Sequence, residues 1–380
     1  MDKKPNNLPF AKKNCDFISE ISNKILKNKY YKKFPDLMTF AFWCRRSNIE
    51  RIKANYNLEN RVGRGEVFHV TPSNVPLNFA YSFCFSFLAG NNNIVKLSNK
   101  KFKQSEILLD IINKLFKKNK YSIYKKNNRF IRYKDNESKT VFFSKNADAR
   151  MIWGGDATVN KLRKIEVNPK CLDLTFPDRN SLAIFYLKKL KKLKEKNFDK
   201  LINDFYNDTY LYNQFACSSP NIIIWIGDYD KKIVEKFWHH LNLKIKSDFK
   251  LADSEILKKY ENKIKSLLIN KKLRINSLSN SQVYRFKLDA PDTNISNFKV
   301  GYGAFIEIKS QNLKILKKII TKKYQTLTYF GFDKKYLKGE VLKFLLPGID
   351  RLVPVGKAID MDVKWDGHDL IYSLTRYISD

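Results

Sequence analysis

One cysteine of this sequence stands where a nucleophile could act. Cys217 lies in the short segment Asn213–Pro220, between an aromatic run ending at Tyr212 and the β-like run Ile222–Ile226. A thiol in a loop between a helix and a strand can meet a substrate, and nearby backbone N–H groups can lower its pKa or hold an oxyanion. The competing interpretation is a small buried cysteine without chemical function, because free cysteines are among the most buried residues.

A pair of glycines forms a second candidate site. Gly154 and Gly155 follow the strand-like run Arg150–Trp153 and precede a helical stretch at 157–165. Because they have no side chains, such a pair lets a phosphate approach backbone N–H groups at the start of a helix. Many glycine pairs are ordinary turns, but the surrounding alternation of strands and helices makes phosphate binding an equal alternative here.

The elements that must position these residues begin with a strand–loop–helix–strand unit. Val67–Val70 is typical of a buried strand, and two prolines stiffen the loop Thr71–Pro76. Leu77–Leu88 is apolar nearly all round, which indicates a buried helix, and Ile94–Leu97 is the next strand. Such a unit opens a doubly wound sheet, although the G-x-G-x-x-G fingerprint is absent. Further strands are predicted at 140–143, 150–153, 181–186, 282–288 and 304–308, and further helices at 106–116, 233–241 and 313–323.

The charge balance raises the question of nucleic-acid binding. The 380 residues include 73 Lys and Arg against 38 Asp and Glu, which gives a net charge of +35. A nucleic-acid footprint clusters on one face, whereas these lysines are spread over the whole length, which favours a general compositional drift. Polyanionic ligands such as phosphorylated cofactors, or an anionic membrane surface, are the alternatives that the charge leaves open.

Composition also limits the compartment and the chemistry. With 43% hydrophobic and 14% aromatic residues, the chain is globular. No apolar run is long enough to span a bilayer and no signal core follows the N-terminus, so we expect a cytoplasmic protein. The five cysteines are scattered without metal-ligand spacing, so neither a metal site nor disulfides are expected.

Seven segments together resemble the acyl-CoA reductase branch of the aldehyde dehydrogenase superfamily, the LuxC type known from bacterial bioluminescence. They extend over most of the chain and keep the order that the family has. The segments are Gly63–His69, Thr71–Pro76, Leu88–Ser98, Trp153–Asp156, Asn213–Pro220, Asp350–Gly356 and Trp365–Gly367.

The resemblance implies an α/β, aldehyde dehydrogenase-like fold, with a doubly wound cofactor domain and an α/β catalytic domain. An N-terminal helical segment is expected at 1–60 and the nicotinamide-cofactor-binding domain at 61–185. The catalytic domain that carries Cys217 then covers 186–340, and the C-terminal segment 341–380 can return to the cofactor domain. A chain of 380 residues is long enough for two domains.

The resemblance further implies the reduction of an acyl thioester to an aldehyde. The Cys217 thiolate would attack the acyl carbonyl, expel CoA and form an acyl-enzyme. The Asn74 side-chain amide and the backbone N–H of Cys217 would hold the oxyanion, as the family pattern implies. The competing interpretation of Asn74 is a turn residue that satisfies its own backbone.

The cofactor is expected to bind near the ends of the predicted strands. The family places a lysine at Lys96 against the adenosine ribose, and Ser98 can donate a hydrogen bond. No Asp or Glu occurs between Lys96 and Lys103, whereas a site that selects NAD usually offers a carboxylate to the ribose 2′-hydroxyl. NADPH is therefore the expected cofactor and NADH the alternative; Lys100 or Lys101 would neutralise a 2′-phosphate unless both are merely solvated. The predicted cofactor-binding residues are Pro72, Lys96, Ser98, Gly154 and Gly155.

One departure from the wider superfamily favours reduction. Hydrolytic aldehyde dehydrogenases carry a Glu-Leu-Gly-Gly segment before the cysteine, and its glutamate activates the deacylating water. The corresponding stretch here, Asp173–Asp178, lacks that motif. The alternatives to the reductase are a hydrolytic aldehyde dehydrogenase, which the missing glutamate disfavours, and a basic nucleic-acid-binding protein without catalysis.

The expected partners follow from this reaction. The acyl donor would be an acyl-CoA or an acyl-protein thioester, and an acyl-transferring partner protein could supply it. A homo-oligomer and peripheral membrane contact are also expected, whereas nucleic acid is not.

Overall fold

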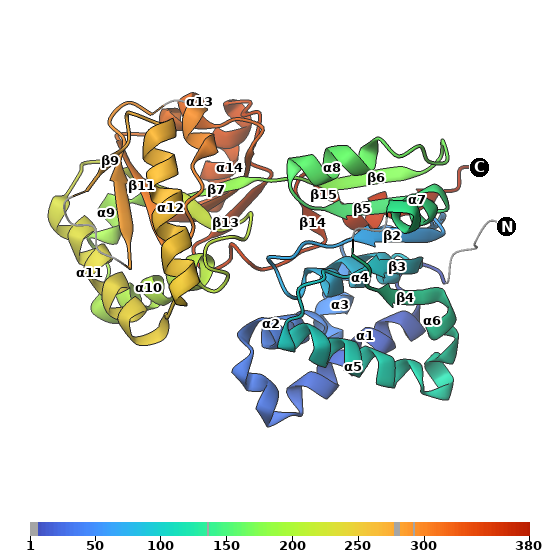
Figure 1. Cartoon of the computed structure of the whole chain (residues 1–380). Coiled ribbons are helices and arrows are strands. Elements are labelled where there is room, and N and C mark those ends of the chain that lie inside the picture. The colour runs from blue at the N-terminus through green and yellow to red at the C-terminus, as the bar shows by residue number, and fades with distance from the viewer. Residues whose placement is uncertain (1–6, 135–136, 277–281, 292) are drawn as a thin grey trace. The chain divides into compact units, whose positions relative to one another are not determined.

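The structure, a computed structural model, describes residues 7–134, 137–276, 282–291 and 293–380 (Figure 1). The chain forms two compact units: the first unit comprises Met1–Asp178 and Met361–Asp380, and the second unit comprises Arg179–Asp360. The C-terminal segment therefore packs with the N-terminal half. Within the first unit, β1 (Arg61–Gly63) pairs antiparallel with β16 (Thr375–Tyr377).

A five-stranded parallel sheet forms the centre of the first unit. Its order is β4–β3–β2–β5–β6. The chain builds outward from β2 through β3 to β4, and then returns to add β5 and β6 on the other side of β2, which is the doubly wound order. The strands are β2 (Glu66–Val70), β3 (Asn92–Lys96), β4 (Asn128–Ile131), β5 (Ala149–Trp153) and β6 (Leu172–Phe176).

Successive side chains of this sheet enter two cores on opposite faces. Val67 belongs to the larger core, whereas Phe68 and Val70 belong to a smaller core that includes Val159 and Leu162. Figure 1 shows helices on both faces of the sheet. The larger core holds α1 (Lys12–Leu26), α2 (Pro35–Trp43), α3 (Arg46–Lys53), α4 (Asn78–Leu88), α5 (Lys103–Phe116), α6 (Ser122–Asn127) and α15 (Leu370–Ser373), and the smaller core holds α7 (Glu137–Lys145) and α8 (Asp156–Arg163).

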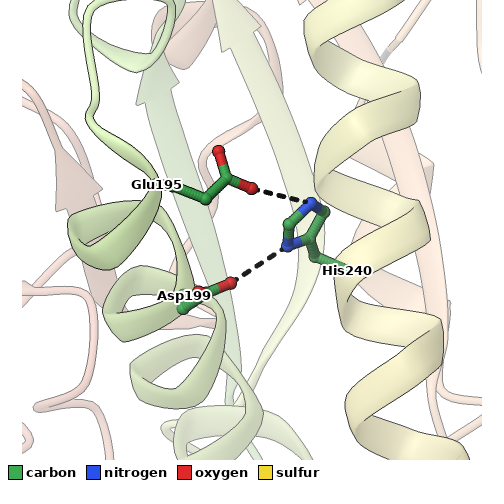
Figure 2. A group of neighbouring side chains, drawn as sticks. All are labelled: Glu195, Asp199 and His240. Atoms are coloured by element: carbon green, nitrogen blue, oxygen red, sulfur yellow. Dashed lines mark hydrogen bonds and ion pairs between the residues drawn. The ribbon is translucent and has the colours of Figure 1, made fainter.

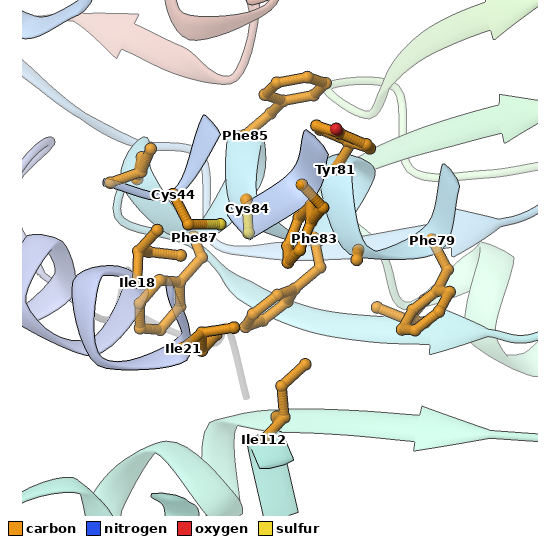
Figure 3. Packing of buried hydrophobic residues seen from close by; sticks show 14 of the residues in the cluster. Ile18, Ile21, Cys44, Phe79, Tyr81, Phe83, Cys84, Phe85, Phe87 and Ile112 are labelled. Carbon is orange, nitrogen blue, oxygen red and sulfur yellow. The ribbon is translucent and has the colours of Figure 1, made fainter. Parts of the chain in front are cut away.

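Helix α4 is buried on every side, as its apolar sequence predicts. Figure 3 shows Phe83 and Phe87 of α4 among the side chains of neighbouring helices, including Ile18 and Ile112. Gly90 follows the helix with φ +91°, and a Cβ atom there would lie 2.1 Å from the carbonyl oxygen of Asn7. Glycine is therefore required where α4 turns into β3.

Some predicted elements of the chain were wrong. The strand predicted at 140–143 lies inside helix α7, where Phe143 packs 5.6 Å from the Phe68 ring. An apolar run this short does not distinguish a strand from a buried helix. The helix predicted at 313–323 is shorter, consisting of η4 (Leu313–Ile315) and α13 (Leu316–Ile319), while β4 and β6 are strands that were not predicted.

The second unit is built on a sheet of order β13–β12–β7–β8–β11–β10–β9. All neighbours pair parallel except the edge strand β9, which is antiparallel to β10. Every residue of β8 is buried, as expected for a central parallel strand with a continuous apolar sequence. The strands are β7 (Asn180–Tyr186), β8 (Pro220–Ile226), β9 (Arg274–Ile275), β10 (Tyr284–Lys287), β11 (Ala304–Ser310), β12 (Tyr324–Phe330) and β13 (Arg351–Pro354).

Two cores again cover the two faces of this sheet. Leu182 and Ile184 of β7 enter the core that contains α13 and α14, whereas Ala183 and Phe185 enter the core that contains α9, α10 and α11. The helices are α9 (Leu187–Leu190), α10 (Glu195–Tyr210), α11 (Lys231–Asp248), α12 (Asp253–Ile269) and α14 (Lys334–Lys343). The mixed α/β architecture with parallel sheets confirms the predicted fold class.

Candidate active site

The residues predicted to bind the cofactor lie at one edge of the first unit's sheet. Because β2, β3 and β5 are parallel, their carboxyl ends share that edge. Pro72 follows β2, Lys96 ends β3 with Ser98 two residues on, and Gly154 and Gly155 follow β5. Ligands of doubly wound sheets bind outside the carboxyl ends of the strands, where the strand order reverses. The predicted residues therefore occupy the position that this type of sheet uses for ligands.

A pocket at this edge brings Pro72 and Ser98 together with two basic side chains, Lys100 and Arg132. Arg132 Nε donates to the carbonyl oxygen of Ser98 over 3.1 Å, and the guanidinium also pairs with Glu106. The pocket has an accessible volume of about 10 Å³, which admits a group the size of a water molecule. A hydroxyl beside two cationic groups suits one oxygen of a phosphate or of another anion.

Arg132 is not among the predicted site residues, because β4 was not recognised as a strand. It directly follows β4 and so belongs to the same carboxyl edge. The sequence of β4, Asn-Arg-Phe-Ile, carries no clear alternation of polar and apolar residues. On the adjacent strand, the Lys96 ammonium lies 5.0 Å from the centre of the Tyr133 ring, which is a cation–π contact.

The glycine pair lies between β5 and α8, as predicted. Gly155 occupies the N-cap position of α8. A Cβ atom on Gly154 would lie 3.2 Å from the Thr158 side chain, whereas one on Gly155 would reach no closer than 3.9 Å to the Asp178 carboxylate. Packing against Thr158 thus accounts for Gly154, whereas the space beside Gly155 could admit a ligand. Phosphate binding by the pair stays a prediction.

Asn74 lies in an exposed loop that is tied at both ends. The backbone N–H and the hydroxyl of Thr71 donate to the Lys96 carbonyl oxygen, over 3.2 and 2.8 Å. At the other end, Ser105 Oγ donates to the carbonyl oxygen of Pro76 over 2.7 Å. The Asn74 side chain is exposed between these ties, so a fixed loop presents it to solvent.

Cys217 lies in the loop between α10 and β8, where the sequence predicts it. Its side chain is half-buried, and Ser181 Oγ donates to its carbonyl oxygen over 2.7 Å. Asn213 and Gln214 both have left-handed φ angles, +51° and +64°, which are unfavourable for residues with a Cβ atom. Other contacts must therefore hold the start of this loop in place.

The side chain of Gln214 supplies those contacts through four hydrogen bonds. Its Nε2 donates to the carbonyl oxygens of Pro220 and Ala304, over 3.0 and 2.9 Å. Its Oε1 accepts from the backbone N–H groups of Gly303 and Ala304, over 3.0 and 2.9 Å. The amide uses its full bonding capacity, and it joins the Cys217 loop to the starts of β8 and β11. The motif residue Gln214 thus holds the start of the Cys217 loop in place.

Three buried polar atoms near the start of β7 and β8 have no hydrogen-bond partner within the described part of the chain. They are Ser219 Oγ, Asn180 Oδ1 and Asn221 Oδ1. A buried polar group without a partner costs roughly 1–3 kcal/mol, so each such group in a native structure needs an explanation. Ser219 is two residues from Cys217, so one of these polar atoms belongs to the loop that carries the thiol.

The segment that lacks the hydrolytic glutamate forms most of β6, and its first carboxylate has a structural partner. The guanidinium of the buried Arg150 binds Asp173 through two hydrogen bonds of 2.7 and 2.6 Å. Arg150 also donates to the Leu162 carbonyl oxygen over 2.9 Å. Asp173 therefore ties β6 to β5 and is not poised to activate a water molecule.

A second group of titratable side chains joins α10 to α11. His240 lies between Glu195 and Asp199, and Figure 2 shows the two carboxylates at opposite nitrogens of its ring, 3.4 and 3.1 Å away. Lys236 also pairs with Glu195 over 2.6 Å. In the described part of the chain these three residues could supply ligands to a cation. However, the carboxylates flank the ring and do not converge on one of its nitrogens, so the arrangement is that of a helix–helix tie.

Asp208 is a buried acid that is not among the predicted residues. It accepts hydrogen bonds from the backbone N–H groups of Gly356 and Ala358, over 2.7 and 2.8 Å. Burial raises the pKa of Asp208 to about 7. Arg351 donates to the carbonyl oxygens of Ala358 and Lys357, so both side chains shape the loop after β13. No local pattern in the sequence indicates that Asp208 binds a loop about 150 residues away.

Comparison with known proteins gives one family match. A family model described as acyl-CoA reductase (LuxC) matches residues 45–379. No curated protein matches the sequence. None of the helices formed by the described residues has the length and apolar character needed to span a membrane.

Solved structures of aldehyde dehydrogenases share the fold. The NAD-dependent benzaldehyde dehydrogenase from Corynebacterium glutamicum is 12% identical, with a TM-score of 0.66 over 98% of this chain and 85% of that one. Glyceraldehyde-3-phosphate dehydrogenase from Methanocaldococcus jannaschii, complexed with NADP, is 15% identical, with a TM-score of 0.65 over 98% and 89%. Aldehyde dehydrogenase 21 from Physcomitrella patens is 10% identical, with a TM-score of 0.69 over 96% and 85%. These similarities confirm the aldehyde dehydrogenase-like fold.

Proposed function

Because the chain belongs to the LuxC acyl-CoA reductase family, an aldehyde-forming class of oxidoreductases, we propose that it reduces an acyl-CoA through an acyl-enzyme on Cys217. The observation that carries this proposal is the Cys217 loop, in which a half-buried thiol sits on a backbone fixed by Gln214 and Ser181. Family membership leaves the nucleic-acid-binding alternative without support.

The proposed chemistry begins at the Cys217 sulfur. The thiolate attacks the carbonyl carbon of the acyl thioester, a new C–S bond forms, and the bond to the CoA sulfur breaks as the CoA thiolate leaves. The backbone N–H of Cys217 and the side-chain amide of Asn74 are the proposed donors to the oxyanion. A nicotinamide cofactor, when bound, would supply the hydride to the acyl carbon. The resulting thiohemiacetal on Cys217 would then collapse, so that its C–S bond breaks, the aldehyde leaves and the Cys217 thiolate is regenerated.

A thiol-specific comparison tests the nucleophile. The full chain is incubated with a radiolabelled acyl-CoA in the absence of cofactor, and the covalent acyl adduct is measured. Cys217→Ser should form no thioester adduct and should lose NADPH-dependent aldehyde formation. Cys171→Ser is the matched control, because Cys171 is also half-buried and has no proposed role. A Cys217→Ser protein that keeps both signals would contradict the proposal, and acyl-protein thioesters offered in the same assay identify the preferred donor.

We further propose that the cofactor is NADPH. Ser98, Lys100 and Arg132 line one pocket at the carboxyl edge of the first unit's sheet, and no carboxylate is among the described residues that line it. A 2′-phosphate would meet a hydroxyl and two cations there. Glu106 pairs with Arg132 from outside the pocket and keeps the guanidinium oriented.

The ratio of kcat/KM for NADPH to kcat/KM for NADH tests this assignment. We expect a ratio above one, which Lys100→Gln should lower by roughly tenfold through loss of one charge-assisted contact. Lys101→Gln is the control, because Lys101 is exposed and does not line the pocket. Equal efficiencies with the two cofactors, or a preference for NADH, would overturn the proposal.

A further inference from the structure

Helix α12 exposes most of its large apolar side chains, although Leu267 is partly buried and packs against the core of the second unit. Six large apolar side chains of α12 are between 39% and 73% exposed, whereas its one fully buried residue is Lys259. With about 100° of rotation per residue, five of the six fall within one arc of roughly 120°, which is the width of a stripe that normally faces a core. The stripe consists of Ile256, Leu257, Tyr260, Ile264 and Leu268, and Ile269 follows at the end of the helix.

Polar side chains attach the opposite face of α12 to the second unit. The buried Lys259 donates from Nζ to the Gln282 carbonyl oxygen over 2.8 Å, and Asn262 Nδ2 donates to the Val300 carbonyl oxygen over 2.9 Å. Glu255 accepts from Asn213 Nδ2 over 3.0 Å. These hydrogen bonds, together with the contact of Leu267 with the core, hold the orientation of α12, and rotating the stripe inward would break them.

The stripe is bordered by lysines. Lys258 and Lys265 lie on one side of it, and Lys263 lies on the other, next to Tyr260 at 4.5 Å from the ring centre. Among acidic neighbours, Glu261 is paired with Lys258 over 3.1 Å, and Asp253 stands before the stripe begins. Two more lysines, Lys271 and Lys272, follow the helix and are exposed. An apolar stripe between basic side chains is the pattern of a helix that lies in a lipid interface.

A second copy of the chain suits this surface poorly. A helix of 17 residues is roughly 25 Å long and 10 Å wide, so its outer face offers on the order of 250 Å², against roughly 800 Å² per partner in a stable interface. Two copies joined along the stripe would also bring two rows of lysines together, in a chain whose net charge is +35. A bilayer surface with anionic headgroups requires no shape complementarity with the helix, and its negative charge complements the lysines that border the stripe.

We propose that α12 is a membrane-contact helix, which inserts its apolar stripe between the headgroups of an anionic bilayer surface. The lysines at its border pair with lipid phosphates and carboxylates, while their aliphatic stems extend along the apolar layer. The inference does not depend on the reaction proposed for Cys217. It gives the predicted peripheral membrane contact a defined surface.

Vesicle co-sedimentation of the full chain tests the proposal. Vesicles of phosphatidylcholine with phosphatidylserine should bind the protein, and vesicles of phosphatidylcholine alone should bind it less. Leu257→Ser/Leu268→Ser should weaken partition to the anionic vesicles by roughly tenfold. The double variant removes two leucine side chains that would insert into the bilayer, while the net charge of the protein is unchanged. Both positions are exposed, so the variant should keep the circular dichroism spectrum and melting temperature of the wild type.

A second double variant tests whether loss of vesicle binding is specific to the stripe or follows from the loss of any two exposed leucines. Leu243→Ser/Leu342→Ser removes two leucines that are 53% and 61% exposed on α11 and α14, and it should bind vesicles like the wild type. The proposal is overturned if the wild type does not bind anionic vesicles, or if the stripe variant binds as tightly as the control. It is also overturned if ultracentrifugation without lipid shows self-association that only the stripe variant loses, since a second copy would then cover α12.

Discussion

In the first unit the candidate residues follow the strands of a parallel sheet, whereas in the second unit Cys217 precedes one. Pro72, Ser98 and Gly154 stand beyond the carboxyl ends of β2, β3 and β5, where the general rule for doubly wound sheets places ligands. Cys217 stands before the amino end of β8, and no general rule for sheets points there. The position of the predicted cofactor-binding residues thus follows from the sheet topology, whereas the position of Cys217 depends on the contacts that hold its loop.

The two loops that carry the proposed catalytic groups are held differently. The Asn74 loop is tied at its ends, by Thr71 and by the bond from Ser105, and its middle is exposed. The Cys217 loop is tied through its interior by the buried side chain of Gln214. A change at the exposed Asn74 should therefore affect chemistry more than stability, whereas a change at the buried Gln214 should affect both.

The largest effect is expected for Asn74→Ala. Loss of one oxyanion donor typically lowers kcat by roughly a hundredfold or more, and the side chain is exposed. Single-turnover acyl transfer from acyl-CoA to the enzyme measures the effect directly. Ser73→Ala is the control, since Ser73 is exposed in the same loop. A loss confined to KM would show that Asn74 binds substrate and does not stabilise the oxyanion.

Elements that a short stretch of sequence specifies could be predicted correctly. The apolar helix α4, the central strand β8 and the Cys217 loop are each marked by composition or by a motif, and all three lie where they were expected. The strand predicted at 140–143 was wrong because three apolar residues in a row fit either a strand or a buried helix. Tertiary contact with Phe68 decides between them.

The partners that fix the candidate sites could not be predicted from the sequence. Gln214 is visible as part of a motif, but its bonds reach Gly303 and Ala304, about ninety residues away. Arg132 lines the pocket that we propose for the cofactor because β4 adds to the sheet beside β3. Such pairings depend on the register of strands that are distant in the chain, and no local pattern specifies that register.

A smaller effect on the rate is expected for Gln214→Glu. The substitution keeps the shape of the side chain, but it turns carboxylate oxygen toward the carbonyl oxygens of Pro220 and Ala304, which lose their donor. We expect a loss of unfolding free energy on the order of 3 kcal/mol and acyl-enzyme formation slower by roughly tenfold. Gln311→Glu, at an exposed turn, makes the same chemical change without either effect.

Thermal unfolding and single-turnover acylation, measured on the same preparations, separate the two roles of Gln214. If Gln214→Glu lowers the melting temperature and leaves the acylation rate unchanged, the side chain stabilises the fold without positioning Cys217. The contrast with Asn74 would then be lost, because neither loop would couple stability to chemistry.

The smallest effect concerns a buried histidine of the first unit. His69 on β2 is fully buried, with Nδ1 2.8 Å from Ser82 Oγ and Nε2 3.0 Å from Asn93 Oδ1. The Asn93 amide group donates to Asn91 and Asn128, so its oxygen is the acceptor, and the neutral ring must carry its proton on Nε2. Both units also bury charged pairs, Arg150 with Asp173 in the first unit and Arg285 with Glu307 in the second, so a buried neutral histidine is the distinct feature of β2.

Burial lowers the pKa of His69 to about 4, below its value of about 6.5 in an unfolded chain. The contribution of the neutral ring to stability is therefore complete above pH 6.5 and is lost as the pH falls toward 4, by at most roughly 1.4 kcal/mol per pH unit. Hydrogen exchange of β2 peptides should show this loss in the wild type and in His239→Gln, where the histidine is exposed. His69→Gln should flatten the dependence. Equal pH slopes in all three proteins would show that His69 is not the group that makes the first unit sensitive to acid.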